Sequence, residues 1–177
     1  EVDPLLGPEM RSTGEVLGLS AHYGEPFYKA QEATQTRLPL EGRVLISVND
    51  KDKPEVVDLA RDFAEEGFKI IASRHTCKLL QEAGIEAQMI NKLQEGRPNM
   101  LDLITNGEVD LIINTPIGRE RQWDDSYLRK TAIKKKVPYM TTIAAAKATI
   151  SGIKAMKRYG GSEVRSLQEL HSLIKDK

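Results

Sequence analysis

The sequence predicts an α/β protein in which a five-stranded parallel sheet is flanked by helices on both faces. Two observations carry this prediction. Short apolar runs alternate with helical stretches from residue 43 to residue 156, and the runs are continuous enough to be buried on both faces of a sheet. The helical stretches between the runs are long enough to serve as the crossover connections that parallel strands need.

The expected elements follow one another in a regular order. A short helix at residues 26–35 precedes a Pro- and Gly-containing linker at residues 38–42. The five expected strands cover residues 44–48, 68–73, 87–90, 109–114 and 138–142. The expected helices cover residues 56–64, 76–83, 99–106, 126–136, 144–156 and 166–175. Gly67 and Gly84 close two of these helices, and Pro54 suits the first turn of another.

Residues 1–37 carry too little apolar surface to fold alone, although residues 12–19 form a candidate strand. We therefore expect two parts, a remnant of a preceding domain at residues 1–37 and a main domain at residues 38–177. The remnant should pack on the main domain, and its removal should leave the main domain folded.

Composition narrows the function classes. Lys+Arg and Asp+Glu are both 26, so no net charge steers the whole chain to nucleic acid or to an anionic membrane. No apolar run approaches the roughly 20 residues of a membrane helix. Cys77 is the one cysteine, so no intramolecular disulfide is possible and a reducing compartment fits. The first residues do not form a signal peptide, and we interpret them as the interior of a longer chain.

Polar side chains follow each expected strand. In chain order they are Ser47 with Lys53, Ser73 with Thr76, Lys92, Asn114 with Thr115, and Tyr139 with Thr141. Because the carboxyl ends of parallel strands meet at one edge, these hydroxyls, amides and cations should form a site for a phosphate or carboxylate. The alternative is that polar residues gather at strand ends in any soluble α/β protein.

The turn at residues 73–76 is the centre of this predicted site. We expect a strand to end at Ser73 and a helix to begin near Thr76, where free N–H groups and the positive dipole end favour an anion. The alternative is that Thr76 only caps its helix. His75 is a candidate general base, with a hydrogen-bonding loop role as the alternative. No P-loop, metal motif or nucleophile elbow occurs, so we predict no catalytic residue and no metal site.

An ordered set of residues connects these features to a known family. The set comprises Ile46-Ser47-Val48 with Asp52-Lys53, Gly67-Phe68 before Ala72-Ser73, Lys92 with Glu95-Gly96-Arg97-Pro98, Asn106-Gly107-Glu108, and Ile112-Ile113-Asn114-Thr115. It resembles the methylglyoxal-synthase-like domain at the C-terminus of the carbamoyl-phosphate synthase large chain. Residues 10–18 and 27–31 resemble the tail of that chain's second ATP-grasp unit.

The resemblance implies a three-layer, Rossmann-like regulatory domain of a cytoplasmic, glutamine-hydrolysing ligase that serves pyrimidine and arginine biosynthesis. It implies binding of a nucleotide monophosphate such as UMP or IMP at Ser47, Lys53, Ser73, Thr76, Lys92, Asn114 and Thr115, and an ornithine-type site at Tyr139 and Thr141. The implied partners are the rest of the large chain, the glutaminase small chain and further copies of the enzyme, but no nucleic acid or membrane. ATP with Mg or Mn would serve the parent enzyme, and this part of the chain would hold no cofactor.

The sequence departs from the family pattern at two positions. His75 stands in place of a glycine in the phosphate turn, and Pro116 stands where some members carry a threonine.

Two alternative functions stay open for this chain. The first is a ligand-free scaffold or oligomerisation domain. The second is a methylglyoxal-synthase-type lyase, whose opening histidine is Asn49 here and whose catalytic aspartate has no match after Asn114.

Overall fold

The computed structural model describes residues 14–20, 24–34, 36–116, 122–159 and 166–172. Its centre is a five-stranded sheet with the order β3-β2-β1-β4-β5, in which every neighbouring pair is parallel. The strands are β1 (Arg43–Ser47), β2 (Lys69–Ser73), β3 (Ala87–Ile90), β4 (Leu111–Asn114) and β5 (Tyr139–Met140). The predicted fold class is therefore confirmed.

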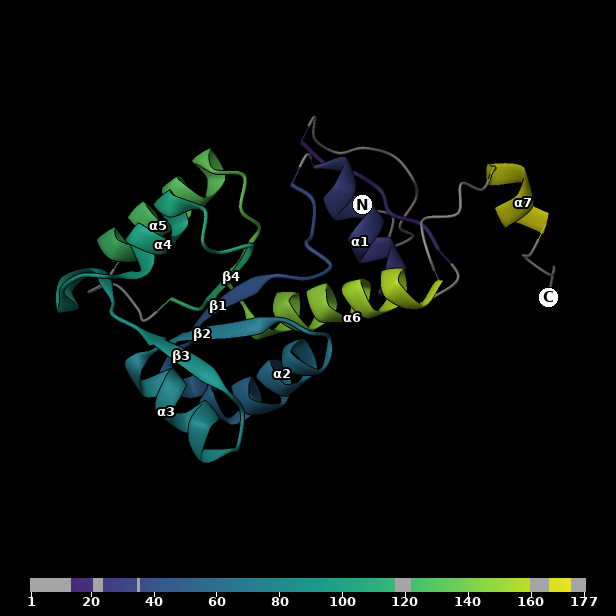
Figure 1. The fold of residues 1–177 in the computed structure, drawn as a ribbon. Coiled ribbons are helices and arrows are strands. Elements are labelled where there is room, and N and C mark those ends of the chain that lie inside the picture. The colour runs from purple at the N-terminus through teal and green to yellow at the C-terminus, as the bar shows by residue number, and fades with distance from the viewer. Residues whose placement is uncertain (1–13, 21–23, 35, 117–121, 160–165, 173–177) are drawn as a thin grey trace, which may run out of the picture.

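Helices cover both faces of the sheet (Figure 1). Helices α4 (Met100–Asn106) and α5 (Gln122–Lys134) lie on one face, and α2 (Lys53–Glu65), α3 (Arg74–Glu82) and α6 (Ile143–Tyr159) lie on the other. Two short 3₁₀ turns, η1 (Asp50–Asp52) and η2 (Leu93–Glu95), follow the carboxyl ends of β1 and β3. Helices α1 (Glu25–Ala33) and α7 (Leu167–Ser172) begin and end the described elements.

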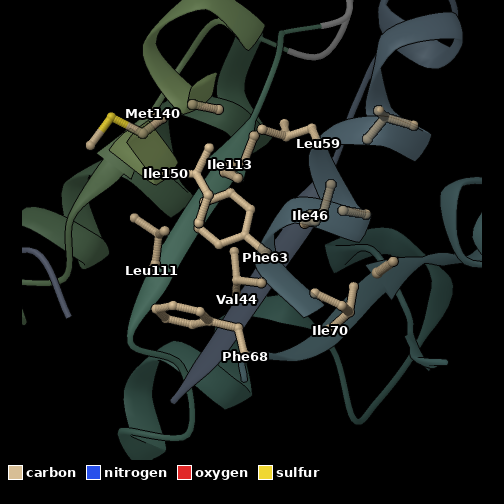
Figure 2. Packing of buried hydrophobic residues seen from close by; sticks show 14 of the residues in the cluster. Val44, Ile46, Leu59, Phe63, Phe68, Ile70, Leu111, Ile113, Met140 and Ile150 are labelled. Atoms are coloured by element: carbon tan, nitrogen blue, oxygen red, sulfur yellow. The ribbon is translucent and has the colours of Figure 1, made fainter. Parts of the chain in front are cut away.

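Each face of the sheet carries its own apolar core. The larger core joins Val44 and Ile46 to Phe63 of α2 and Ile150 of α6 (Figure 2). Phe63 is fully buried and meets Phe68 edge to face, with ring centroids 5.4 Å apart. The smaller core packs the alternate strand residues, such as Leu45 and Ile112, against α4 and α5. Because both faces are buried, the strands need apolar residues at consecutive positions, as the sequence shows.

Several expected boundaries were wrong, and α6, for example, runs to Tyr159, three residues beyond its expected end. Helix α3 begins at Arg74 rather than near Thr76, because Ser73 ends the strand in extended geometry and is itself the N-cap. Helix α5 begins at Gln122, four residues before the expected position. Strand β5 ends at Met140, because the Thr142 hydroxyl already accepts a 3.1 Å hydrogen bond from the Ala145 N–H in the first turn of α6. The candidate strand at 12–19 is not formed over its described part, residues 14–19, and residues 12 and 13 lie outside the description.

Helix α1 packs against α6. Tyr28 is buried with the larger core, and its hydroxyl donates a 3.3 Å hydrogen bond to the Leu38 carbonyl. Gly24 precedes α1 with φ +91°, and a Cβ there would lie 2.6 Å from the backbone oxygen of Ser151 in α6. A Cβ on Gly152 would lie 3.1 Å from the Gly24 carbonyl oxygen. Close approach of the two segments therefore depends on both glycines.

Deleting residues 1–37 should leave a main domain that unfolds cooperatively, but with a melting temperature lowered by roughly 5 °C. The loss follows because Tyr28 no longer covers the face of α6 near Gly152. Differential scanning calorimetry of the chain starting at Leu38, beside the 177-residue chain, measures the change. Loss of a cooperative transition would contradict the proposed boundary.

Candidate functional site

The carboxyl ends of the strands meet at one edge, as predicted. Ser47 at the end of β1 pairs in register with Asn114 at the end of β4, and both side chains are buried. Lys92 follows β3 and is partly buried. Ser47, Lys92 and Asn114 share a cavity of about 30 Å³, which is completed by Leu93, Met100, Asp124, Asp125 and Leu128. This cavity has room for about one water molecule, and both polar and apolar side chains line it.

A rigid turn presents Lys53 to this edge. The Asn49 side-chain oxygen accepts hydrogen bonds from the Lys51 N–H at 2.9 Å and the Asp52 N–H at 3.2 Å. The buried Thr115 hydroxyl oxygen in turn accepts from the Asn49 backbone N–H at 2.9 Å and from its side-chain amide at 3.1 Å. Thr115 therefore fixes the turn that carries Lys53, and two donors of the protein already occupy its oxygen.

Several charges gather beside this turn. The Lys53 ammonium lies 2.6 Å from the Asp50 carboxylate. This hydrogen bond and the charge of Lys53 hold the pKa of Asp50 below its ordinary value, and the charges of His75 and Lys92 lower that pKa further. Cationic side chains from α2, α3 and the segment after β3 thus act on one exposed carboxylate. An incoming anion would experience the same field.

The first turn of α3 faces the same edge. Ser73, its N-cap, makes no side-chain capping bond, and its hydroxyl donates instead to the Thr76 hydroxyl at 3.2 Å. Both side chains are buried, so the suggestion that Thr76 caps the helix is wrong. His75 is exposed in regular helical geometry, and none of the described non-glycine residues except Lys136 has a positive φ. The turn therefore needs no glycine at position 75, and its first N–H groups have no side-chain cap.

One carboxylate at this edge, that of Asp125, was not among the site residues predicted from the sequence. The Asn114 amide donates to Asp125 at 2.9 Å and to the Tyr139 hydroxyl at 2.6 Å. The second oxygen of Asp125 is buried and has no hydrogen-bond partner among the described atoms. The sequence signal was the pair Asp124-Asp125 at the start of a helix, where carboxylates are favoured by the helix dipole. Only the fold places that first turn against the end of β4.

Tyr139 and Thr141, the residues of the expected ornithine-type site, take different positions beside β5. Tyr139 opens β5 rather than following its carboxyl end, and it reaches the edge only through its long side chain, which contacts Asn114. Burial is the main cause that raises the pKa of the Tyr139 hydroxyl, so it stays protonated at neutral pH. Thr141 is exposed after β5, and no hydrogen bond of the described chain joins it to Tyr139 or Asn114.

The described residues also set limits on other kinds of site. In those ranges no cluster of three or more His, Cys, Asp or Glu side chains could hold a metal ion. No helix in the part of the chain that the structure describes is long and apolar enough to cross a membrane. The edge of the sheet offers hydroxyls, amides and cations, together with Asp50 and two carboxylates of α5.

Comparison with known proteins identifies similar chains. Residues 55–141 match the family described as the MGS-like domain. The chain is 45% identical over 177 residues to the "carbamoyl phosphate synthase large chain, C-terminal section" of Aquifex aeolicus, covering 98% of this chain and 33% of that protein. It is 46% identical over 175 residues to the carbamoyl phosphate synthase large chain of Gemmatimonas aurantiaca, covering 99% of this chain and 16% of that one. The chain thus spans a third or less of the length of these curated relatives.

A solved structure supports the fold. The crystal structure of methylglyoxal synthase from Elizabethkingia anophelis superposes with a TM-score of 0.54 at 20% identity, covering 64% of this chain and 80% of the synthase. At this identity the likeness concerns the fold alone.

Proposed function

Because this chain carries an MGS-like domain and is related to the C-terminal section of the carbamoyl phosphate synthase large chain, we propose that it binds a regulatory nucleotide for that ligase. The ligand would be a phosphorylated nucleotide such as UMP or IMP. Its binding would modulate synthesis of carbamoyl phosphate for the pyrimidine and arginine pathways. The proposed setting is the cytoplasm, with the rest of the large chain and a glutaminase small chain as partners, and with further copies of the enzyme joined through this domain.

One observation carries the proposal. The uncapped first turn of α3 and the cations Lys53 and Lys92 act at the same sheet edge, although they come from three separate segments. A phosphate dianion suits this set, because helix N–H groups and ammonium groups both make charge-assisted hydrogen bonds to it. The Thr76 hydroxyl accepts from Ser73, so its own hydrogen remains to be donated.

A ligand larger than phosphate is supported by the neighbouring cavity. Asn114 and the partnerless oxygen of Asp125 lie beside the cavity that Lys92 lines. A buried acceptor without a partner is costly, and a sugar hydroxyl of the ligand would supply the missing donor. Leu93, Met100 and Leu128 complete the cavity, which has room for a single hydroxyl of the ligand but not for its base. A nucleotide satisfies both requirements, whereas inorganic phosphate satisfies only the first.

Thermal-shift measurements test the proposal. The 177-residue chain is heated with UMP, IMP, other nucleotides, ornithine and N-acetylglutamate, and uridine and inosine serve as controls that lack the phosphate. A ligand at 100 times its dissociation constant should add roughly 2.7 kcal/mol to the free energy of unfolding, or about 5–10 °C. If no phosphorylated compound shifts the transition at millimolar concentration, a ligand-free scaffold is the better description.

The lyase alternative has its own test. Asp124 and Asp125 place carboxylates beside Ser47 and Lys92, so the edge resembles an acid–base site more than the sequence indicated. We nevertheless expect no conversion of dihydroxyacetone phosphate to methylglyoxal, because the chain has Asn49 in place of the lyase histidine. A colorimetric assay for methylglyoxal measures this. Turnover that His75→Ala or Asp125→Asn abolished would contradict the prediction.

A further inference from the structure

The Asp50 carboxylate is paired with one of the cations of the proposed site, Lys53. It is 2.6 Å from the Lys53 ammonium, and its side chain is 91% exposed while that of Lys53 is 33% exposed. His75 of α3 and Lys92 after β3 also interact electrostatically with it. Asp50 is thus a carboxylate of the protein itself within the field that would attract a phosphate.

This arrangement differs from an ordinary pair of flexible surface side chains, because its backbone is fixed. Asn49 caps the 3₁₀ turn that contains Asp50, and Thr115 holds Asn49 through two hydrogen bonds. Lys53 begins α2 directly after this turn. The turn and the helix therefore keep Asp50 and Lys53 three residues apart on one short rigid segment. The backbone therefore loses little entropy when they pair, and only the side-chain rotamers of Asp50 and Lys53 must be ordered.

We infer that Asp50 is a resident counter-ion, which an incoming phosphate must displace from Lys53 before it binds. The inference rests on the proposed phosphate site and adds a regulatory element to it. The Lys53 ammonium has three N–H donors but a single charge, and while Asp50 neutralises that charge the ligand gains less from it. The displaced carboxylate also remains close to the bound dianion and repels it. Asp50 therefore sets the affinity of the site below the value that its cations alone would give.

Substitution of Asp50 isolates this effect. Asp50→Asn removes the charge but keeps the shape, and Asp50→Glu keeps the charge. Asp58→Asn makes the same charge change on α2, away from the turn that contains Asp50. Asp58 is a matched control because it is 81% exposed and pairs with Arg61 at 2.9 Å, also three residues away. Isothermal titration calorimetry of the 177-residue chain with UMP and with inorganic phosphate measures the affinity of each variant.

Asp50→Asn should bind UMP roughly three- to tenfold more tightly than Asp58→Asn, and Asp50→Glu should stay within about twofold of the unsubstituted chain. A second readout follows the carboxyl carbon of Asp50 by ¹³C NMR. Saturating UMP should raise the pKa of Asp50, since the ligand withdraws Lys53 and adds negative charge nearby. A merely structural role for Asp50 would not produce that change.

The outcomes separate the two proposals. If the unsubstituted chain binds UMP and Asp50→Asn binds it no more tightly than Asp58→Asn does, Asp50 does not limit the affinity. The inference is then overturned, while the proposed function stands. If neither the unsubstituted chain nor Asp50→Asn binds UMP or phosphate at millimolar concentration, the proposed function fails and the inference fails with it. If Asp50→Asn binds UMP and the unsubstituted chain does not, the result supports both the proposed function and the inference.

Discussion

Replacing Lys92 by alanine should weaken binding of a nucleotide monophosphate by about ten- to a hundredfold. Lys92 is partly buried, lines the cavity with Ser47 and Asn114, and acts on the Asp50 carboxylate. A charge-assisted hydrogen bond in such a position contributes about 1.5–3 kcal/mol, which corresponds to the expected loss of affinity. Calorimetric titration of UMP and IMP measures it.

The control for Lys92→Ala is Lys78→Ala. Lys78 lies on α3, one turn after its first residue, Arg74. The Lys78 side chain is 78% exposed, and its ammonium lies 3.8 Å from the Glu82 carboxylate. Its removal changes the net charge equally but should alter the affinity less than twofold. The affinity of the unsubstituted chain should also fall as salt is raised, because the contacts are ionic. Equal effects of the two substitutions would show that the ligand responds to overall charge rather than to this site.

Replacing Asn114 by alanine should destabilise the chain by about 2–4 kcal/mol. Its buried amide donates to both Asp125 and Tyr139, so the substitution leaves both oxygens of Asp125 without a protein donor. Each buried group left unsatisfied costs about 1–3 kcal/mol. Chemical denaturation monitored by circular dichroism gives the free energy of unfolding, and the melting temperature should fall by about 5–15 °C.

Asn106→Ala is the matched control for this substitution. Asn106 also donates its side-chain amide to a carboxylate, Glu108, at 3.1 Å, but it is exposed at the end of α4. Water replaces the lost bond there, and the stability should change by less than about 0.5 kcal/mol. The double substitution of Asn114 and Asp125 by alanine should be less destabilising than the sum of the single substitutions, because no carboxylate is left unsatisfied. Strict additivity would mean that the hydrogen bond between them contributes little.

The sequence by itself determined the sheet and the segments that line its edge. Consecutive apolar residues such as Val44 and Leu45 require burial on both faces, and parallel strands between two layers of helices provide it. Because parallel strands end at one edge, the sequence also predicted that Ser47 and Asn114 would lie at the same edge, and the register shows that they are neighbours there. These inferences succeeded because they depend on local pattern and on a general rule of topology.

Tertiary structure alone decided which charges act on one another. Asp125 contacts Asn114 from a helix whose start follows a long connection, and sequence spacing could not give that distance. His75 and Lys92 act on Asp50 from segments that lie 25 and 42 positions away, so their common field depends on the strand order β3-β2-β1. Likewise, Thr115 supports the Asn49 turn because β1 and β4 are neighbours in the sheet. Side-chain contacts between distant segments are fixed by packing and register, and packing and register exist only in the folded chain.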